Sequence, residues 1–260
     1  LMADILRATK AVPGFHAGAR LTLVEASAHL RGVQAASLSD HAPIWLDRVE
    51  DLPEAPLFLV ANEFLDALPI RQFLNGPQGW QERLVGVRDD GLGFGLSAPL
   101  PRVPDTAAFR NAPKGALVED NLAARQSVAE VSMRIARHGG VAYWVDYGDW
   151  RSQGDTLQAL RQHRPDAPLA HPGEADLTAH VDFEPLAALA PAFAYDAQGA
   201  VLARLGIDSR AARLAQGLTG PKLESHHAAH RRLTHPEEMG SLFKVLAVTS
   251  AGAPPPPGFA

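Results

Sequence analysis

Three short, mainly apolar runs, continuous as opposed to alternating, constrain the fold more than any other feature of the chain. They span Leu21 to Glu25, Leu57 to Ala61 and Val141 to Val145. Continuous runs of this length are typical of strands that are buried on both faces of a parallel sheet. Helical patterns occur between them, at residues 26–36 and 119–138. Alternating strands and helices predict an open α/β sheet whose connections are right-handed crossovers.

Residues 71–104 interrupt this alternation with two short strand-like segments. The segments are Gln81 to Val87 and Leu92 to Leu96, and the turn sequence Asp89-Asp90-Gly91 joins them. An Asp-Gly step between strand-like runs is typical of a β-hairpin. We therefore predict that a β-hairpin is inserted into the sheet domain at this point.

Residues 154–206 mix helical runs with prolines and predict a cap over the ligand-binding edge of the sheet. A further strand is predicted at Leu242 to Thr249. The proline-rich tail at residues 251–260 is predicted to be extended and to lie outside the core. We thus expect one domain over residues 1–250, with insertions at about 71–104 and 154–206.

The composition excludes several classes of protein. With 46% hydrophobic and 20% charged residues the chain is ordinary for a globular protein, and no apolar stretch approaches the ~20 residues of a membrane span. A net charge of −5 lacks the basic surface that nucleic-acid binding needs. The absence of cysteine excludes disulfides, thiolate nucleophiles and cysteine-ligated zinc. We therefore expect no nucleic-acid partner and no integral membrane placement.

Polar residues directly after the apolar runs are the candidate site residues, because ligands of open α/β sheets bind outside the carboxyl ends of the strands. Glu25 follows the first run and could accept hydrogen bonds from both ribose hydroxyls of an adenosine cofactor. An acid at a strand end is also often a helix cap or a solvated residue. Asp146 and Tyr147 follow the third run, where they could either line a ligand site or cap a helix. We expect Glu25, Asn62 and Asp146 to lie at one edge of the sheet.

The second run is followed by an unusual cluster of polar side chains. Asn62, Glu63 and Asp66 fall within five positions of an otherwise apolar segment. Buried carboxylates are costly without partners, so such a cluster after a core strand indicates a site. The alternative is the start of a helix, in which Asn62 caps the helix and the two acids complement its dipole.

This cluster begins a series of motifs that resemble the MidA family, a group that includes a mitochondrial complex I assembly factor with arginine methyltransferase activity. The motifs run in order along nearly the whole chain: N-E-F-L-D-A-L-P-I-R-Q-F (Asn62 to Phe73), W-V-D-Y-G (Trp144 to Gly148), G-D-T-L-Q-A-L-R-Q-H (Gly154 to His163), P-G-E-A-D-L-T-A-H-V-D-F (Pro172 to Phe183) and L-F-K-V-L-A-V-T-S (Leu242 to Ser250). The resemblance implies a class I methyltransferase fold, Rossmann-like with a mostly parallel sheet, and S-adenosylmethionine as cofactor. It also implies methylation of arginine in a protein substrate.

Within this resemblance, Asn62 and Glu63 lie where methyltransferases of the fold hold the acceptor near the sulfonium methyl group. A guanidinium is cationic and a poor nucleophile, so carboxylates must bind its charge and leave a lone pair on one nitrogen. Glu63 could do so with Asp66 or with Asp146. We predict Asn62, Glu63, Asp66 and His180 as catalytic residues.

Other side chains carry two interpretations each. His180, with Asp182 two positions on, could orient the substrate or take up its proton, and a structural hydrogen bond at a strand end is an equal alternative. Asp51 could contact the adenine amino group or lie in an exposed turn. The predicted cofactor contacts are Glu25, Asp51, Asn62, Asp146 and Tyr147.

No metal site is predicted. His226 and His230 share a helical face, but no carboxylate completes an H-E-x-x-H arrangement, and Arg231 and Arg232 would repel a cation. A solvated helix is the preferred interpretation of this segment.

One departure from the family pattern concerns the cofactor. The family carries a glycine-rich loop of the form E-x-G-P-G-x-G, which, with an N-terminal strand, would precede Leu1. The chain opens instead on an amphipathic helical pattern, Leu1 to Lys10, that has no N-cap. Glycines in that loop let the backbone approach the cofactor. We therefore expect this chain to bind S-adenosylmethionine at least tenfold more weakly than one with the loop, about 1.4 kcal/mol, and it could be inactive.

For partners, the resemblance implies a protein substrate, such as a respiratory complex I subunit, and allows a homodimer. A bacterial member would be cytoplasmic, whereas eukaryotic relatives would lie in the mitochondrial matrix. The sequence leaves two alternatives, a methyltransferase for a small molecule or another protein acceptor, and a non-catalytic assembly or scaffold protein of the same fold. A nicotinamide-dependent oxidoreductase would share an acid at a strand end but finds no support in residues 62–69.

Overall fold

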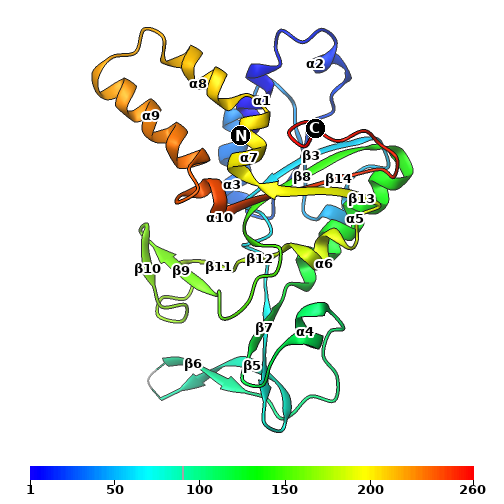
Figure 1. The fold of residues 1–260 in the computed structure, drawn as a ribbon, viewed down its shortest axis with the longest axis vertical. Helices are drawn as coiled ribbons and strands as arrows, with labels where there is room; N and C mark the ends of the chain where they lie inside the picture. The colour runs from blue at the N-terminus through cyan, green and yellow to red at the C-terminus, as the bar shows by residue number, and fades with distance from the viewer. Residues whose placement is uncertain (90) are drawn as a thin grey trace. The chain divides into compact units, whose positions relative to one another are not determined.

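A computed structural model describes residues 1–89 and 91–260 of the chain (Figure 1). The described residues form two compact units, Leu1–Glu54 and Ala55–Ala260. The smaller unit holds α1 (Met2–Ala8), α2 (Phe15–Gly18), β1 (Thr22–Val24), α3 (Ala28–Ser37), β2 (Ile44–Leu46) and a 3-10 turn (Val49–Asp51).

The smaller unit contains the first predicted strand and helix. β1 pairs with β2 in parallel, with Thr22 opposite Ile44. Helix α3 begins after Ser27, whose hydroxyl accepts a hydrogen bond from the N–H of Leu30 at 3.3 Å. A serine at this position satisfies one of the free donors of the first helical turn. The strand, the connection and the helix therefore follow the predicted pattern.

The larger unit is built on a five-stranded sheet. Its strands are β3 (Leu57–Asn62), β8 (Gly140–Asp149), β12 (Val181–Asp182), β13 (Ala192–Ala197) and β14 (Phe243–Thr249). β3 and β12 run parallel to β8, whereas β14 is antiparallel to β8 and to β13. With the β1–β2 pair included, parallel pairs outnumber antiparallel pairs by three to two in these two sheets.

Helix α5 (Leu122–His138) supplies one side of the core of this sheet. Asn121 caps it, accepting from the N–H of Ala124 at 2.8 Å. Val128, Val131 and Ile135 recur at helical spacing and are completely buried. Figure 1 shows α5 and α6 (Phe183–Ala187) below the sheet and α7 (Gln198–Arg204) above it. Helices on both faces explain why β14 reads as a continuous apolar run. The expectation that β3 is buried on both faces is wrong, because Phe58 is 80% exposed and Val60 is 44% exposed.

The predicted hairpin is present and belongs to a four-stranded antiparallel sheet of its own. The sheet has the order β6-β5-β4-β7, from β4 (Arg71–Gly76), β5 (Gly79–Arg88), β6 (Gly91–Leu96) and β7 (Leu117–Asp120). Phe73, Phe109 and Val118 form a small buried core beneath it, with α4 (Ala107–Asn111) alongside. In the predicted turn, Asp90 lies outside the described residues. The expectation of helix from Glu119 is wrong by three residues, because Glu119 and Asp120 still pair with β4.

Residues 154–206 differ from the predicted cap in one respect. Their first part does form a separate sheet of β9 (Gln158–Arg161), β10 (Arg164–Asp166) and β11 (Asp176–Thr178). Their last part contains β13, which is a strand of the central sheet, so the insertion is shorter than predicted. An Ala-rich strand next to a proline gives only a weak strand signal in the sequence.

The C-terminal region also departs from expectation. After α8 (Ile207–Ala215), α9 (Gly220–Thr234) and α10 (Met239–Leu242), β14 ends at Thr249 and the proline-rich tail returns to the sheet unit. The Tyr143 hydroxyl donates to the carbonyl of Pro257 at 3.0 Å, and Arg204 Nε donates to the carbonyl of Gly258 at 2.6 Å. Two side chains from distant segments thus bind the backbone of the tail, which the sequence did not predict, although most residues of the tail are exposed.

Candidate functional site

β3 and β8 pair in parallel, and β3 ends at Asn62, opposite Val145 of β8, which continues to Asp149. Asn62 and Asp146 are thus at one edge of one sheet, as predicted. Glu25 belongs to the smaller unit, where it follows the carboxyl end of β1. We call the group formed by Asn62, Glu63, Asp66, Asp146 and Tyr147 the strand-end cluster.

Asp146 holds the loop that follows β3. Its Oδ2 atom accepts hydrogen bonds from three consecutive backbone N–H groups, those of Phe64 (3.2 Å), Leu65 (2.9 Å) and Asp66 (3.3 Å). Its Oδ1 atom accepts from the N–H of Tyr147 at 3.0 Å. Only 1% of the residue is exposed. Backbone donors therefore occupy both oxygens of the Asp146 carboxylate. Its role in the site is to hold the loop that carries Glu63 and Asp66.

Burial, and after it the nearby Asp66 carboxylate, raise the pKa of Asp146 to about 7, although the backbone N–H groups oppose the shift. Burial also raises the pKa of Asp66, and the charges of Glu63 and Asp176 act in the same direction. Asp66 is 5% exposed, and its Oδ1 atom has no hydrogen-bond partner within the part of the chain that the structure describes. A buried acceptor in this state is well suited to bind a donor from a ligand.

Asn62 and Glu63 are exposed at the end of β3. Asn62 Nδ2 donates to Glu63 Oε1 at 3.1 Å. Glu63 has a φ of +52°, a left-handed conformation that a residue with a Cβ adopts only at some cost. Leu65 to Leu68 form a turn and no helix begins at Asn62, so the alternative in which these residues cap a helix is wrong. The exposed amide and carboxylate are free to face a ligand.

His180 and Tyr147 come together across the same edge. Their ring centroids are 5.5 Å apart and the planes are nearly perpendicular, at 86°. The N–H of Ala179 donates to the carbonyl of Asp66 at 3.1 Å, which ties the segment before His180 to the loop after β3. Burial raises the pKa of Tyr147 above its usual value, so the phenol is a neutral hydrogen-bond donor near pH 7. The structure thus brings His180 to the strand-end cluster, as the prediction requires.

Two polar residues near the cluster, Thr178 and Asp176, were not predicted as site residues, and a third, Asp182, was considered only together with His180. Thr178 is buried, and Asp176 on β11 lies close enough for its charge to raise the pKa of Asp66. Burial raises the pKa of Asp182 to about 7, and a small pocket beside it is also lined by Asp120, Arg125 and His180. The sequence held a signal for these residues, since all of them except Asp120 and Arg125 fall in one of the quoted motifs.

In the smaller unit, both interpretations of Glu25 survive. Its carboxylate accepts from the N–H of Ser27 at 2.9 Å and from Gln34 Nε2 at 3.0 Å, next to the start of α3. A carboxylate has about four acceptor sites, so capacity remains for further donors. Asp51 is exposed at the end of the 3-10 turn, which is the geometry of the exposed-turn alternative and leaves its side chain accessible.

Comparison with known proteins identifies the family. Residues 1–201 match the model of a family of S-adenosyl-L-methionine-dependent methyltransferases. The chain belongs to this family. A mitochondrial protein of Drosophila melanogaster named protein arginine methyltransferase NDUFAF7 homolog is 31% identical over 83% of the chain and 52% of its own length. The Danio rerio protein arginine methyltransferase NDUFAF7, also named as mitochondrial, is 31% identical over 95% of the chain and 66% of its own length. The chain thus spans about half to two thirds of these relatives.

Solved structures give the same result. A Burkholderia thailandensis protein bound to S-adenosyl-homocysteine is 29% identical, has a TM-score of 0.81, and matches 100% of this chain and 70% of its own. A second Burkholderia thailandensis structure is 30% identical with a TM-score of 0.77, over 93% and 69% of the two chains. The fold is that of a class I methyltransferase, and its cofactor is S-adenosylmethionine.

The residues present fit this cofactor. Within the smaller unit, Glu25 and Asp51 keep accessible carboxylate groups after a strand and a 3-10 turn, which suits the hydroxyls and the amino group of an adenosyl group. Asp146 fits direct contact less well, because backbone donors already occupy both of its oxygens. All five predicted cofactor contacts stay predictions.

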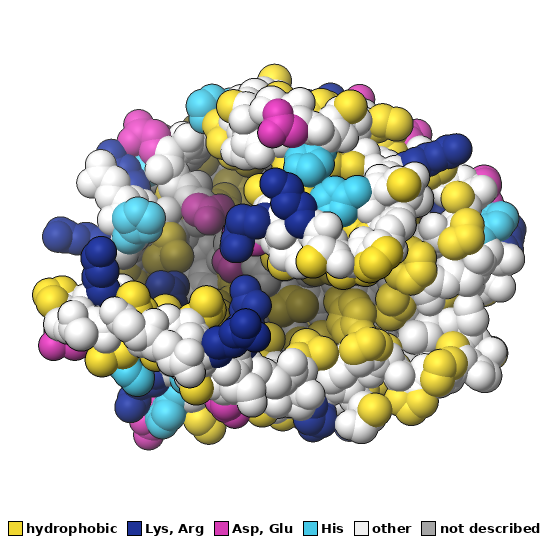
Figure 2. All heavy atoms as spheres, turned by 90° about the horizontal axis from the view of Figure 1, so that it is seen from above, with side chains coloured by type: hydrophobic (Ala, Val, Ile, Leu, Met, Phe, Trp, Pro, Cys, Tyr) yellow, Lys and Arg dark blue, Asp and Glu magenta, His cyan; other side chains and the backbone are white. Residues whose placement is uncertain are grey.

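The histidine-rich helix α9 has a role that the sequence did not indicate. His226 Nε2 lies 2.9 Å from the carbonyl of Ala211, and His230 Nε2 lies 2.9 Å from Asp208 Oδ1, so two histidines bind α9 to α8. In the view from above, histidine side chains lie beside lysine or arginine side chains on the surface (Figure 2). Among the described residues, no group of three or more His, Asp or Glu side chains has the geometry to hold a metal ion. No helix there is long and apolar enough to cross a membrane.

Proposed function

We propose that this methyltransferase transfers the methyl group to arginine in a protein acceptor. The carrying observation is the pair of carboxylates on the loop after β3. Glu63 is exposed, while Asp66 is buried with one oxygen unpartnered among the described residues. A guanidinium has five N–H donors in a planar fork and pairs best with carboxylates in this arrangement. The names of the NDUFAF7 relatives support the same acceptor.

The chemistry assigns a role to each side chain. S-adenosylmethionine supplies a methyl group on a positively charged sulfur when it is bound. Glu63 and Asp66 would hold the guanidinium and concentrate its charge away from one nitrogen, which leaves that nitrogen able to attack. Asp66 must be ionised to do this, and a bound guanidinium would lower its raised pKa. His180 would accept the proton that the nitrogen loses, since a neutral imidazole is a good base near pH 7.

Geometry favours Asp66 over Asp146 as the partner of Glu63. Both oxygens of Asp146 accept backbone hydrogen bonds, and 1% of the residue is exposed. Asp66 keeps an oxygen without a partner among the described residues, and it lies on the same loop as Glu63. The sequence had left this choice open.

Other parts of the proposal rest on the family resemblance. A subunit of respiratory complex I is the candidate acceptor. Homodimer formation and a cytoplasmic location for this chain stay predictions, which sedimentation analysis and cell fractionation would check.

The decisive experiment is methylation of a cell lysate by the full-length protein with isotope-labelled cofactor, followed by mass spectrometry of the labelled residue. Label on arginine side chains supports the proposal. Label on lysine, histidine or a small molecule would contradict arginine specificity while leaving the methyltransferase activity intact. Binding of the cofactor without any transfer would favour a scaffold protein that keeps the fold.

A further inference from the structure

Thr156 lies in the motif at residues 154–163, to which the proposed function gives no role. Its hydroxyl accepts a hydrogen bond from the backbone N–H of His180 at 2.9 Å. The same hydroxyl donates to Glu119 Oε2 in a short contact. A hydroxyl has one proton, so its donation to Glu119 directs a lone pair of Thr156 toward His180.

Glu119 fixes Thr156 through both of its carboxylate oxygens. Besides the contact with the hydroxyl, Glu119 Oε1 accepts from the backbone N–H of Thr156 at 3.0 Å. Two bonds between one carboxylate and one residue restrict both the position of the residue and its side-chain rotamer. The Thr156 side chain can therefore transmit the position of Glu119 to the backbone of His180.

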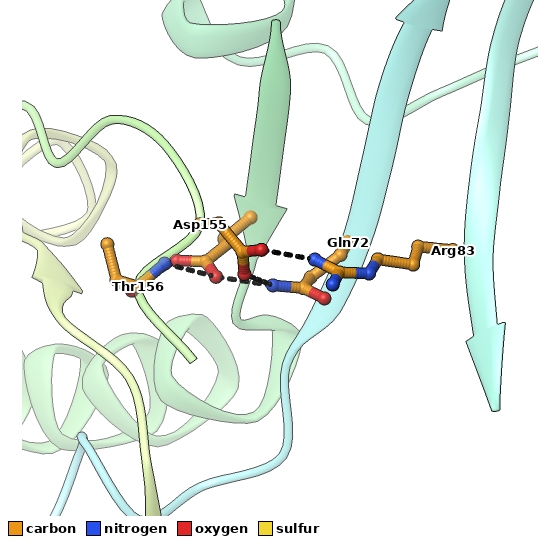
Figure 3. A network of polar contacts seen from close by, with 5 residues as sticks. Gln72, Arg83, Asp155 and Thr156 are labelled. Atoms are coloured by element: carbon orange, nitrogen blue, oxygen red, sulfur yellow. Dashed lines mark hydrogen bonds and ion pairs between the residues drawn. The ribbon is translucent and has the colours of Figure 1, made fainter. Parts of the chain in front are cut away.

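Glu119 is in turn anchored to the four-stranded sheet. It lies on β7 opposite Gln72 of β4, and Gln72 Nε2 donates to Glu119 Oε1 at 2.7 Å. Gln72 also donates to Asp155 Oδ1 at 2.9 Å, and Arg83 of β5 pairs with Asp155 Oδ2 at 2.5 Å. Figure 3 shows these side chains converging from β4, β5 and the loop that carries Thr156. Gln72 is 5% exposed, so the amide is held in a buried network.

His180 has a second constraint on its other side. Its ring packs at right angles against Tyr147, whose own backbone N–H is bound to Asp146. The backbone of His180 is thus held by Thr156 and its ring lies against the strand-end cluster. An imidazole that must meet a proton on an acceptor nitrogen needs both its place and its ring orientation fixed.

We propose that Thr156, held by Glu119, is a positioning residue that fixes His180 against Tyr147 at the acceptor side of the site. The catalytic part of this inference rests on the proposed function, in which His180 accepts a proton. The inserted four-stranded sheet would then have a purpose beyond packing, since it provides the anchor for this chain of hydrogen bonds.

The first test measures the position of His180 without any activity. The histidines are labelled with ¹³C and their ring resonances are recorded, and His180→Gln assigns the resonance of interest. A ring lying edge-on to Tyr147 carries a ring-current shift that Tyr147→Leu removes. Thr156→Val keeps the shape of the side chain and removes its hydroxyl, so it should abolish much of this shift, whereas Thr156→Ser should preserve it. Thr249→Val is the matched control, because Thr249 is buried near the opposite end of β14 from the cluster.

The second test measures turnover on the full-length protein with a peptide pool containing arginine. Thr156→Val should lower kcat about tenfold with the KM for cofactor unchanged, and Thr156→Ser should restore kcat to within about twofold. If Thr156→Val does not fold, Glu119→Gln replaces it. An NH₂ group in place of Glu119 Oε2 cannot accept the proton of the Thr156 hydroxyl, so no lone pair of the hydroxyl is fixed toward the N–H of His180 and the same resonance should move.

The outcomes separate the two proposals. An unchanged His180 resonance in both variants overturns the positioning role. A displaced resonance with unchanged kcat supports positioning but removes His180 from the proposed chemistry. A displaced resonance with lower kcat and rescue by serine supports both.

Discussion

Replacing Asp146 by asparagine tests whether this carboxyl holds the loop after β3. Its two oxygens receive four backbone N–H groups, three at Oδ2 and one at Oδ1. An asparagine side chain has one oxygen, and its NH₂ group must then face at least one of these donors. Leaving a buried N–H unpaired costs about 1–3 kcal/mol. We expect Asp146→Asn to lower the free energy of unfolding by that amount at pH 5.

The loss of unfolding free energy caused by Asp146→Asn should become smaller as the pH rises from 5 to 7. Asp146 has a pKa of about 7 in the folded protein against an ordinary pKa of 3.8 in the unfolded chain. Between these values the folded state holds a proton that the unfolded chain has released, so stability falls as the pH rises toward 7. From pH 5 to pH 7 the wild-type protein loses roughly 2 kcal/mol through this group. Asparagine does not titrate, so the cost of the substitution should shrink by roughly 2 kcal/mol over the same range.

The assay is urea unfolding of both proteins at pH 5 and pH 7, followed by circular dichroism. Asp182 contributes a slope of the same sign, but it is present in both proteins and cancels in the difference. Asp149→Asn is the control, because Asp149 is exposed at the end of the same strand and its bond to the N–H of Trp150 can be kept by the amide oxygen. We expect this control to change stability by less than ~0.5 kcal/mol. An Asp146→Asn cost that is equal at the two pH values would refute the buried-carboxyl argument.

Three further substitutions test other parts of the structure. Glu63→Gln should leave the cofactor affinity and the melting temperature nearly unchanged. It should lower the single-turnover rate at least a hundredfold, about 3 kcal/mol, because it removes the charge-assisted pair between Glu63 and the guanidinium. Normal turnover with a slightly lower melting temperature would remove Glu63 from the site. Gly148→Ala should lower the free energy of unfolding in urea by about 3 kcal/mol or more, because the added Cβ would lie 2.1 Å from the Val181 carbonyl oxygen and the φ of Gly148 is +149°. A decrease below ~1 kcal/mol would contradict this packing. Tyr143→Phe should cost about 1 kcal/mol and speed carboxypeptidase digestion, because it frees the carbonyl of Pro257; an unchanged digestion rate would contradict docking of the tail.

Sequence reasoning located the strands of the site but not their side-chain partners. β3 and β14 begin and end close to the predicted runs, whereas β8 continues four residues beyond Val145. Burial on both faces accounts for the continuous apolar run of β14, but Phe58 and Val60 of β3 are exposed. Which carboxylate would pair with Glu63 depends on whether Asp66 or Asp146 receives the backbone donors. That depends on a loop conformation with positive φ at Glu63, for which the sequence has no glycine signal.

The contacts of the tail and the strand β13 escaped prediction for different reasons. The tail is bound by Tyr143 and Arg204, which lie 114 and 54 positions from their acceptors. Contacts at such separations leave no periodic pattern within one segment, whereas the helical spacing of Val128 and Val131 does. β13 was hidden for a different reason, because its alternation is weak and its neighbours include prolines.

The loop held by Asp146 also has a consequence for how the protein folds. The three hydrogen bonds that hold it join residues 80 to 82 positions apart, so closing this loop costs roughly 2 kcal/mol more entropy than closing one of ten residues. The four-stranded sheet lies entirely inside the closed segment and needs only its own strands. It can form while the chain is still being synthesised, and the strand-end cluster must wait until β8 has emerged. Substitutions in the cluster should therefore act mainly on the unfolding rate and leave the folding rate nearly unchanged.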